Sequence, residues 1–166
     1  MRGCWVCLEG YFHVDILGIT GNTIKMKPRI VLDTNIVVSG LKSAKGVSYY
    51  LLSLLKKSLF EICVTVPLIL EYETVLKRVH SSLRLGFEDI NDFIDQLCFI
   101  AHKQDIFYLW RPFLSDPADN MVLEAAVASK SSFIITYNKQ DFHGVEKFNL
   151  KALTPLEFLK KIGAVS

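Results

Sequence analysis

Short apolar runs bounded by polar residues predict the strands of this chain. A strand of a parallel sheet that is covered on both faces meets no water, so its residues form a continuous apolar run. Runs of this kind recur along the chain and each one ends at polar or acidic residues. The predicted strands are residues 30–32, 61–66, 106–110, 133–136 and 150–153.

Apolar residues spaced three and four positions apart predict helices between these strands. After Pro67, which suits the first turn of a helix, apolar residues recur at this spacing up to position 79. Further predicted helices lie at residues 47–55, 90–101 and 120–129, and a last one starts with the cap Thr154-Pro155-Leu156-Glu157. The alternation predicts a three-layer α/β fold, with about five strands in a mostly parallel, twisted sheet and helices on both faces.

The first 25 residues differ from the rest, because they mix glycine, cysteine, aromatic and acidic residues without a sustained period. Met26 then opens a basic segment that leads directly into the first strand. We therefore expect residues 1–25 to be an extension or a mis-called start, with translation beginning at Met26 and residues 26–166 forming one domain. The alternative is an additional strand at residues 11–17, whose composition suits a strand.

Composition places the chain among globular proteins. Its 166 residues are 51% hydrophobic and 22% charged, which is typical of a domain that buries a core and argues against extensive disorder. The net charge of +2 is too small to indicate a nucleic-acid partner. No apolar run approaches the roughly 20 residues that cross a bilayer, so a soluble, cytoplasmic protein without a membrane partner is expected.

Acidic residues near the ends of the predicted strands are the main candidates for chemistry. Asp33 and Asp141 follow the first and fourth strands, Glu71 follows the second, and the pair Asp116 and Asp119 precedes a helix. Strand ends meet at one edge of an α/β sheet, where ligands bind. Carboxylates gathered there repel one another unless a cation neutralises them, and oxygen ligands without a Cys/His set select Mg²⁺ or Mn²⁺. The pattern therefore indicates metal-assisted phosphate chemistry.

Each acidic position also has an ordinary explanation. Asp33 with Thr34 and Asn35 could end the strand in a turn, because all three side chains bond to nearby backbone. Asp116 and Asp119, on either side of a proline, form a helix-start signature. Capping does not exclude metal binding, since a carboxylate has several acceptor sites.

The helix after the second strand carries two glutamates, and periodicity does not distinguish them. Glu71 and Glu73 flank the apolar stripe on opposite sides. Glu73 has Lys77 four residues further on and can form a surface ion pair with it. Glu71 lacks such an explanation and is the better candidate ligand.

Other motifs are missing from the chain. The four histidines show no metal-ligand spacing, and there is no GxSxG, GxxxxGK[ST] or GxGxxG sequence. Serine hydrolases, P-loop NTPases and dinucleotide enzymes are therefore poorly supported. Thr136 and Asn138 instead offer neutral oxygen atoms close to Asp141.

Four segments in order resemble the PIN domain family: residues 30–36, 71–78, 116–120 and 135–142. The resemblance runs from about Met26 to the C-terminus and is closest to the VapC-like toxins of toxin–antitoxin pairs. It implies a Mg²⁺- or Mn²⁺-dependent ribonuclease, with a parallel sheet, helices on both sides and an acidic pocket at the strand ends.

The resemblance also implies roles for individual residues. The catalytic acids would be Asp33, Glu71, Asp119 and Asp141, the metal ligands Asp33, Asp116, Asp119 and Asp141, and the supporting polar residues Thr34, Asn35, Thr136 and Asn138. The chain departs from the family pattern at one position, because many PIN domains have an aspartate where this chain has Asn138. Asp141 is expected to substitute for it, which leaves a second metal site and the strength of catalysis open.

The implied partners are an RNA substrate and a cognate antitoxin that inserts a segment, often with a basic residue, into the acidic pocket. Substrate phosphates could contact Lys42, Lys45 and Lys139, although solvated lysines are also ordinary surface residues. A homodimer is common in the family, and residues 49–52 could serve it or could belong to the core.

Two alternatives remain open. A haloacid-dehalogenase-like phosphatase would use Asp33 as nucleophile, but it usually needs a second aspartate two residues on, where this chain has Asn35. A PIN-like module could instead bind RNA or protein without cutting, and Asn138 supports this second alternative.

Overall fold

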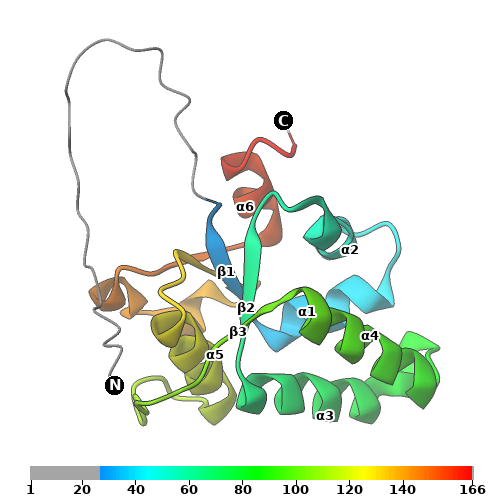
Figure 1. Cartoon of the computed structure of the whole chain (residues 1–166), viewed down its shortest axis with the longest axis horizontal. Coiled ribbons are helices and arrows are strands. Elements are labelled where there is room, and N and C mark those ends of the chain that lie inside the picture. The colour runs from blue at the N-terminus through cyan, green and yellow to red at the C-terminus, as the bar shows by residue number, and fades with distance from the viewer. Residues whose placement is uncertain (1–26, 166) are drawn as a thin grey trace, which may run out of the picture.

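A parallel sheet lies at the centre of the computed structural model, which describes residues 27–165 (Figure 1). Its five strands are β1 (Arg29–Leu32), β2 (Glu61–Val64), β3 (His102–Lys103), β4 (Phe133–Ile135) and β5 (Lys151–Leu153). They lie in the order β3-β2-β1-β4-β5, and every neighbouring pair is parallel. The expectations for residues 1–25, including the additional strand at residues 11–17, fall outside the described residues.

Helices flank this sheet, as the alternating sequence pattern predicts (Figure 1). They are α1 (Thr34–Lys42), α2 (Val47–Ser53), α3 (Val66–Leu83), α4 (Phe87–Ile100), α5 (Pro117–Ala128) and α6 (Pro155–Lys161), with short 3-10 turns η1 (Leu55–Lys57), η2 (Lys139–Phe142) and η3 (Val145–Phe148). Helix α5 packs against β1 and β4, and α6 packs against β5, whereas α1 packs against α2 and α3. The predicted α/β class is confirmed.

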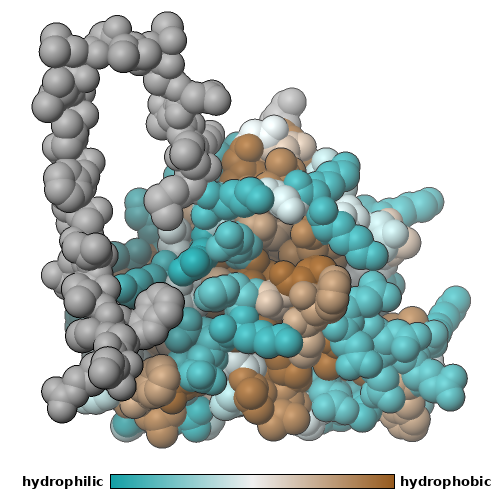
Figure 2. All heavy atoms as spheres, viewed as in Figure 1, coloured by the Kyte–Doolittle hydropathy of each residue, from teal (hydrophilic) through white to brown (hydrophobic). Residues whose placement is uncertain are grey.

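The buried core explains why these segments form strands and helices. All three apolar residues of the first strand, Ile30, Val31 and Leu32, are fully buried between helical layers. Figure 2 shows hydrophobic areas among hydrophilic ones on the face viewed there, so some apolar side chains stay at the surface. Within residues 27–165, no helix combines the length and the apolar character that crossing a membrane requires.

The prediction of the third strand was wrong. The sequence pattern predicts it at residues 106–110, whereas β3 is the pair His102–Lys103, and residues 104–116 form neither helix nor strand. The ladder ends where the Gln104 N–H donates to the Val64 carbonyl at 2.9 Å, and Phe107 and Tyr108 beyond it are exposed. Strand preference reflects packing on a sheet face, and these exposed side chains are not packed on one in the described part of the chain.

Element boundaries differ from the predictions in three informative places. Helix α1 begins directly after Asp33, where the polar sequence suggests only a turn. Helix α5 begins at Pro117 and not at residue 120, because Asp116 caps it. At the second strand, Thr65 is already the N-cap of α3 and accepts from the Leu68 N–H, so β2 ends at Val64.

Candidate active site

The candidate site lies where the direction of the sheet connections reverses. From β1 the chain proceeds through α1 and α2 to β2, and from β4 it proceeds to β5 on the other side. The adjacent carboxyl ends of β1 and β4 therefore form a topological switch point, the usual ligand-binding place in open α/β sheets. Asp33 directly follows β1, and Thr136 directly follows β4.

Hydrogen bonds hold the Asp33 carboxylate at this switch point. Its Oδ2 atom accepts from the Thr136 hydroxyl at 2.6 Å and from the Asn35 amide at 2.7 Å. The Asn35 amide also reaches Thr136 Oγ1 at 3.3 Å, so the three side chains form one network across two strands. The sequence-predicted supporting residues Asn35 and Thr136 are thus in contact with Asp33.

Burial sets the electrostatics of Asp33, which is only 7% exposed. Desolvation raises the pKa of Asp33, and the negative charge of Asp141 raises it further. The hydrogen bond from Thr136 and those from the backbone of Asn35 and Thr34 act in the opposite direction. The carboxylate is therefore fixed in place, in surroundings where a nearby cation would stabilise its charged form.

Two more aspartates reach the site from the start of α5. Asp116 is the N-cap, and its Oδ1 accepts from the Ala118 N–H at 2.8 Å. Asp119 lies in the first turn, half-buried. Burial raises the pKa of Asp119 to about 6, and the charges of Asp33, Asp116 and Asp141 contribute in that order. Asp116 and Asp119 of α5 and Asp141 of the loop after β4 line one pocket, and Asp33 acts on Asp119 electrostatically.

A polar pocket of about 310 Å³ opens beside these carboxylates. Its lining is Phe113, Leu114, Ser115, Asp116, Asp119, Gln140, Asp141 and His143. Sequence reasoning missed Ser115, Gln140 and His143; the last two belong to the same polar loop as Asp141, which was the available signal. A second pocket of about 320 Å³, between α1, α2 and α4, is largely apolar and is lined by none of the candidate acids.

Other predicted site residues are placed differently. Glu71 lies half-buried on α3 and does not line the pocket, and its charge is not among those that raise the pKa of Asp33 or Asp119. Its neighbour Glu73 forms the predicted ion pair with Lys77. The roles assigned to Glu71 therefore stay a prediction.

The polar residues and lysines around the site also have defined places. The Asn138 N–H donates to Thr136 Oγ1 at 2.9 Å, but Asn138 does not line the pocket. Lys139 forms an ion pair with Glu157 at 2.8 Å, and Glu157 also belongs to the capping box of α6. Lys42 and Lys45 are exposed and do not line the pocket.

The chemistry of the four aspartates fits a hard divalent cation, since carboxylate oxygens are the ligands that Mg²⁺ and Mn²⁺ prefer. In the part of the chain that the structure describes, no three acidic, histidine or cysteine side chains converge closely enough to hold a metal ion together. Mg²⁺ retains several water ligands and is usually held by one or two carboxylates, so a closed cage is not required. The donor set is therefore suited to the ion without enclosing it.

Comparisons with known proteins point to one family. The family model described as "PIN domain" matches residues 29–140. Among solved structures, the chain is similar to one in the crystal structure of VapBC2 from Rickettsia felis bound to a DNA fragment from their promoter, with a TM-score of 0.55 and 18% sequence identity. That alignment covers 76% of this chain and 98% of the other. At this identity the likeness concerns the fold. No curated protein matches the chain.

Proposed function

The chain belongs to the PIN domain family, and from this premise we propose that it is a metal-dependent endoribonuclease and the toxin of a toxin–antitoxin pair. The observation that supports the proposal most is that Asp116, Asp119 and Asp141 line one polar pocket, while Asp33, at the switch point of the sheet, acts electrostatically on Asp119. The charge of Asp141 contributes to the raised pKa of Asp33, and the charges of Asp33, Asp116 and Asp141 contribute to that of Asp119. Such a cluster is costly for folding unless a cation binds, which supports a functional role.

In this proposal the four aspartates hold Mg²⁺ or Mn²⁺, and Glu71 completes the set of catalytic acids. The ion, when bound, lowers the pKa of a water molecule and stabilises charge on the phosphate. Thr136 and Asn35 orient the Asp33 carboxylate through their bonds to its Oδ2 atom. One carboxylate accepts the proton of the attacking water, and RNA enters through the pocket next to Asp119 and Asp141.

The protein partners belong to the same proposal. The likeness to a chain of the VapBC2 structure supports an antitoxin partner for this chain. An acidic pocket would accept a basic antitoxin side chain by charge complementarity. For a homodimer, Tyr49 and Tyr50 are exposed, Leu52 is partly buried and Leu51 is buried in the core, so the two tyrosines are the most accessible residues of that segment. Action on cellular RNA would place the protein in the cytoplasm.

A second candidate function is RNA or protein binding without cleavage. Its support is Asn138, which stands where many family members have an aspartate. Asn138 also does not line the pocket. Asp141 does line the pocket and acts electrostatically on both Asp33 and Asp119, which supports the nuclease. Family membership leaves the phosphatase alternative without support.

The test is cleavage of a panel of single-stranded and structured RNAs by the full chain, with Mg²⁺, with Mn²⁺ and with EDTA. We expect cleavage that needs the cation and is lost in Asp33→Asn. Asp141→Asn should lower the rate by about 100-fold or more, as expected for loss of a metal ligand or proton acceptor, whereas Asn138→Ala should retain most of it. Folded, cation-loaded protein that cuts no RNA would favour the binding module.

A further inference from the structure

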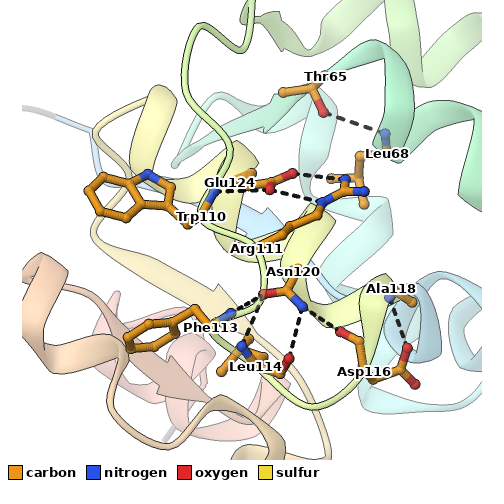
Figure 3. Close-up of polar contacts among 10 residues, drawn as sticks. All are labelled: Thr65, Leu68, Trp110, Arg111, Phe113, Leu114, Asp116, Ala118, Asn120 and Glu124. Carbon is orange, nitrogen blue, oxygen red and sulfur yellow. Dashed lines mark hydrogen bonds and ion pairs between the residues drawn. The ribbon is translucent and has the colours of Figure 1, made fainter.

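The loop before α5 forms one wall of the acidic pocket although it has no regular secondary structure. Residues 110–116 lie between β3 and α5, and Phe113, Leu114, Ser115 and Asp116 of this loop line the pocket. A wall built from irregular chain must be held by other contacts. Figure 3 shows that two side chains of α5, Asn120 and Glu124, point into the loop and bond to it.

Asn120 uses both ends of its amide to hold the loop, and it is 3% exposed. Its Oδ1 accepts from the Phe113 N–H at 3.3 Å and from the Leu114 N–H at 3.0 Å. Its Nδ2 donates to the Leu114 carbonyl at 2.9 Å and to the Asp116 carbonyl at 3.0 Å. The backbone around the capping aspartate is thereby tied to the second turn of α5 (Figure 3).

Glu124 makes the second attachment and is 1% exposed. Its Oε1 accepts from the Trp110 N–H at 3.2 Å and from Arg111 Nε at 3.0 Å, and its Oε2 accepts from Arg111 Nη2 at 3.0 Å. This two-pronged pairing is the strongest geometry available to a carboxylate and a guanidinium. A buried carboxylate without such a partner is destabilising. Because Arg111 belongs to the loop, any movement of the loop away from α5 would leave the Glu124 carboxylate unpaired.

Helix geometry explains why one helix can serve both the site and the loop. Asn120 and Glu124 are four residues apart and lie on the same side of α5, whereas Asp119 points about 100° away from Asn120. The helix therefore carries the acid on one side and the attachments on another. Asp116 and Asp119 repel each other and their neighbours, so their separation depends on how firmly the loop is held.

We propose that Asn120, Glu124 and Arg111 form a clamp that fixes the wall of the acidic pocket and thereby sets its affinity for a divalent cation. They are positioning residues: Asn120 bonds directly to the Asp116 carbonyl, whereas Glu124 and Arg111 hold the start of the same loop at residues 110 and 111. That a cation binds in this pocket rests on the proposed function, but the effect of the clamp on cation affinity can be measured without any RNA. Outer-shell partners of metal ligands typically change metal affinity by about 10- to 100-fold when they are replaced.

The test uses the full chain with Glu124→Gln and, separately, Arg111→Gln. These substitutions change the net charge in opposite directions, so electrostatics alone would shift cation affinity in opposite directions. The clamp predicts that both raise the Kd for Mn²⁺, by about 10- to 100-fold in calorimetric titration. Matched controls are Glu61→Gln and Arg29→Gln, because this ion pair, at 3.0 Å, lies at the opposite ends of the strands. Neither control should change the Kd.

Hydrogen exchange of the metal-free protein supplies the second readout. The amides of Trp110, Phe113 and Leu114 should exchange faster in both clamp variants, while the amide of Val31 in the core should not. If Arg111→Gln does not fold, Arg111→Lys replaces it, since it keeps the charge but loses the two-pronged geometry.

Opposite shifts of the Mn²⁺ Kd, faster exchange without a change in Kd, or a parent protein that binds no Mn²⁺ would each overturn the proposal. A parent protein whose Mn²⁺ affinity depends on the clamp but which cuts no RNA would instead reject the ribonuclease.

Discussion

Thr136 shows how a single residue links two strands to the candidate site. It is fully buried, donates to Asp33 Oδ2, and accepts from the Asn35 amide and the Asn138 N–H. One hydroxyl thus satisfies three polar groups at the ends of β1 and β4. The arrangement leaves the Asp33 carboxylate little freedom, which suits a proposed ligand that must not move when a cation arrives.

Asp119 offers a pH-dependent prediction for the metal-free protein. Its pKa of about 6 in the folded state lies above the unfolded value near 3.9, so the folded state binds more protons between these values. This group therefore lowers stability as the pH rises from about 4 to 6, and the loss persists above pH 6. Asp119→Asn should raise the free energy of unfolding at pH 7.5, but not at pH 4.

The expected gain is roughly 1 kcal/mol, well below the full value of the pKa shift, because solvent screens a half-exposed carboxylate. Urea unfolding in EDTA at both pH values measures it. Asp92→Asn, at an exposed position on α4, is the control and should be neutral at both pH values. An equal effect of Asp119→Asn at pH 4 and pH 7.5 would contradict the electrostatic explanation.

At the level of elements, Tyr72 connects α3 to the end of β1. It is fully buried, and its hydroxyl donates to the Leu32 carbonyl, one residue before Asp33. Burial, and then the charge of Asp33, raise the pKa of Tyr72 well above its usual value, so the hydroxyl remains a donor. The helix that follows β2 thereby supports the strand that carries the first acid.

Tyr72→Phe should lower the free energy of unfolding by about 1 kcal/mol, because it removes a buried hydrogen bond and leaves a carbonyl without that donor. Chemical denaturation of the full chain measures the change. Tyr108→Phe, which alters a side chain that is 68% exposed, is the matched control and should have little effect. A loss of the same size in both variants would mean that the bond to Leu32 contributes nothing specific.

At the scale of the whole molecule, the proposed cation site couples metal binding to folding. A cation that binds only the folded state stabilises it by about 2.7 kcal/mol at 100 times its Kd. For a chain of this size, that corresponds to a rise in Tm of roughly 5 to 10 °C. We expect Mn²⁺ to raise the Tm of the full chain in this way, and EDTA to reverse the rise.

Asp33→Asn should reduce this rise in Tm, whereas Glu61→Gln at the far end of the sheet should keep it. Thermal melts with increasing Mn²⁺ measure both. A Tm that increases equally in Asp33→Asn would show that the cation binds elsewhere on the molecule, and the site proposal would then be wrong.

Much of the fold could be predicted from local patterns. The burial of Ile30, Val31 and Leu32 follows from a continuous apolar run, and the caps of α5 and α6 follow from Asp116 and Thr154. The positions of the acids after the strands also follow, because parallel strands bring their carboxyl ends to one edge. These features depend on a few neighbouring residues, so the linear sequence contains them.

Tertiary packing decided the remainder. The order β3-β2-β1-β4-β5 puts β4 beside β1, which is why Thr136 meets Asp33 across about a hundred residues of sequence. Residues 106–110 resemble a strand yet pair with no strand among the described residues, since sheet pairing depends on distant parts of the chain. In the sequence, nothing distinguishes the clamp residue Glu124 from an ordinary helical glutamate. Only the folded loop, which places Arg111 next to Glu124, explains why this glutamate is buried.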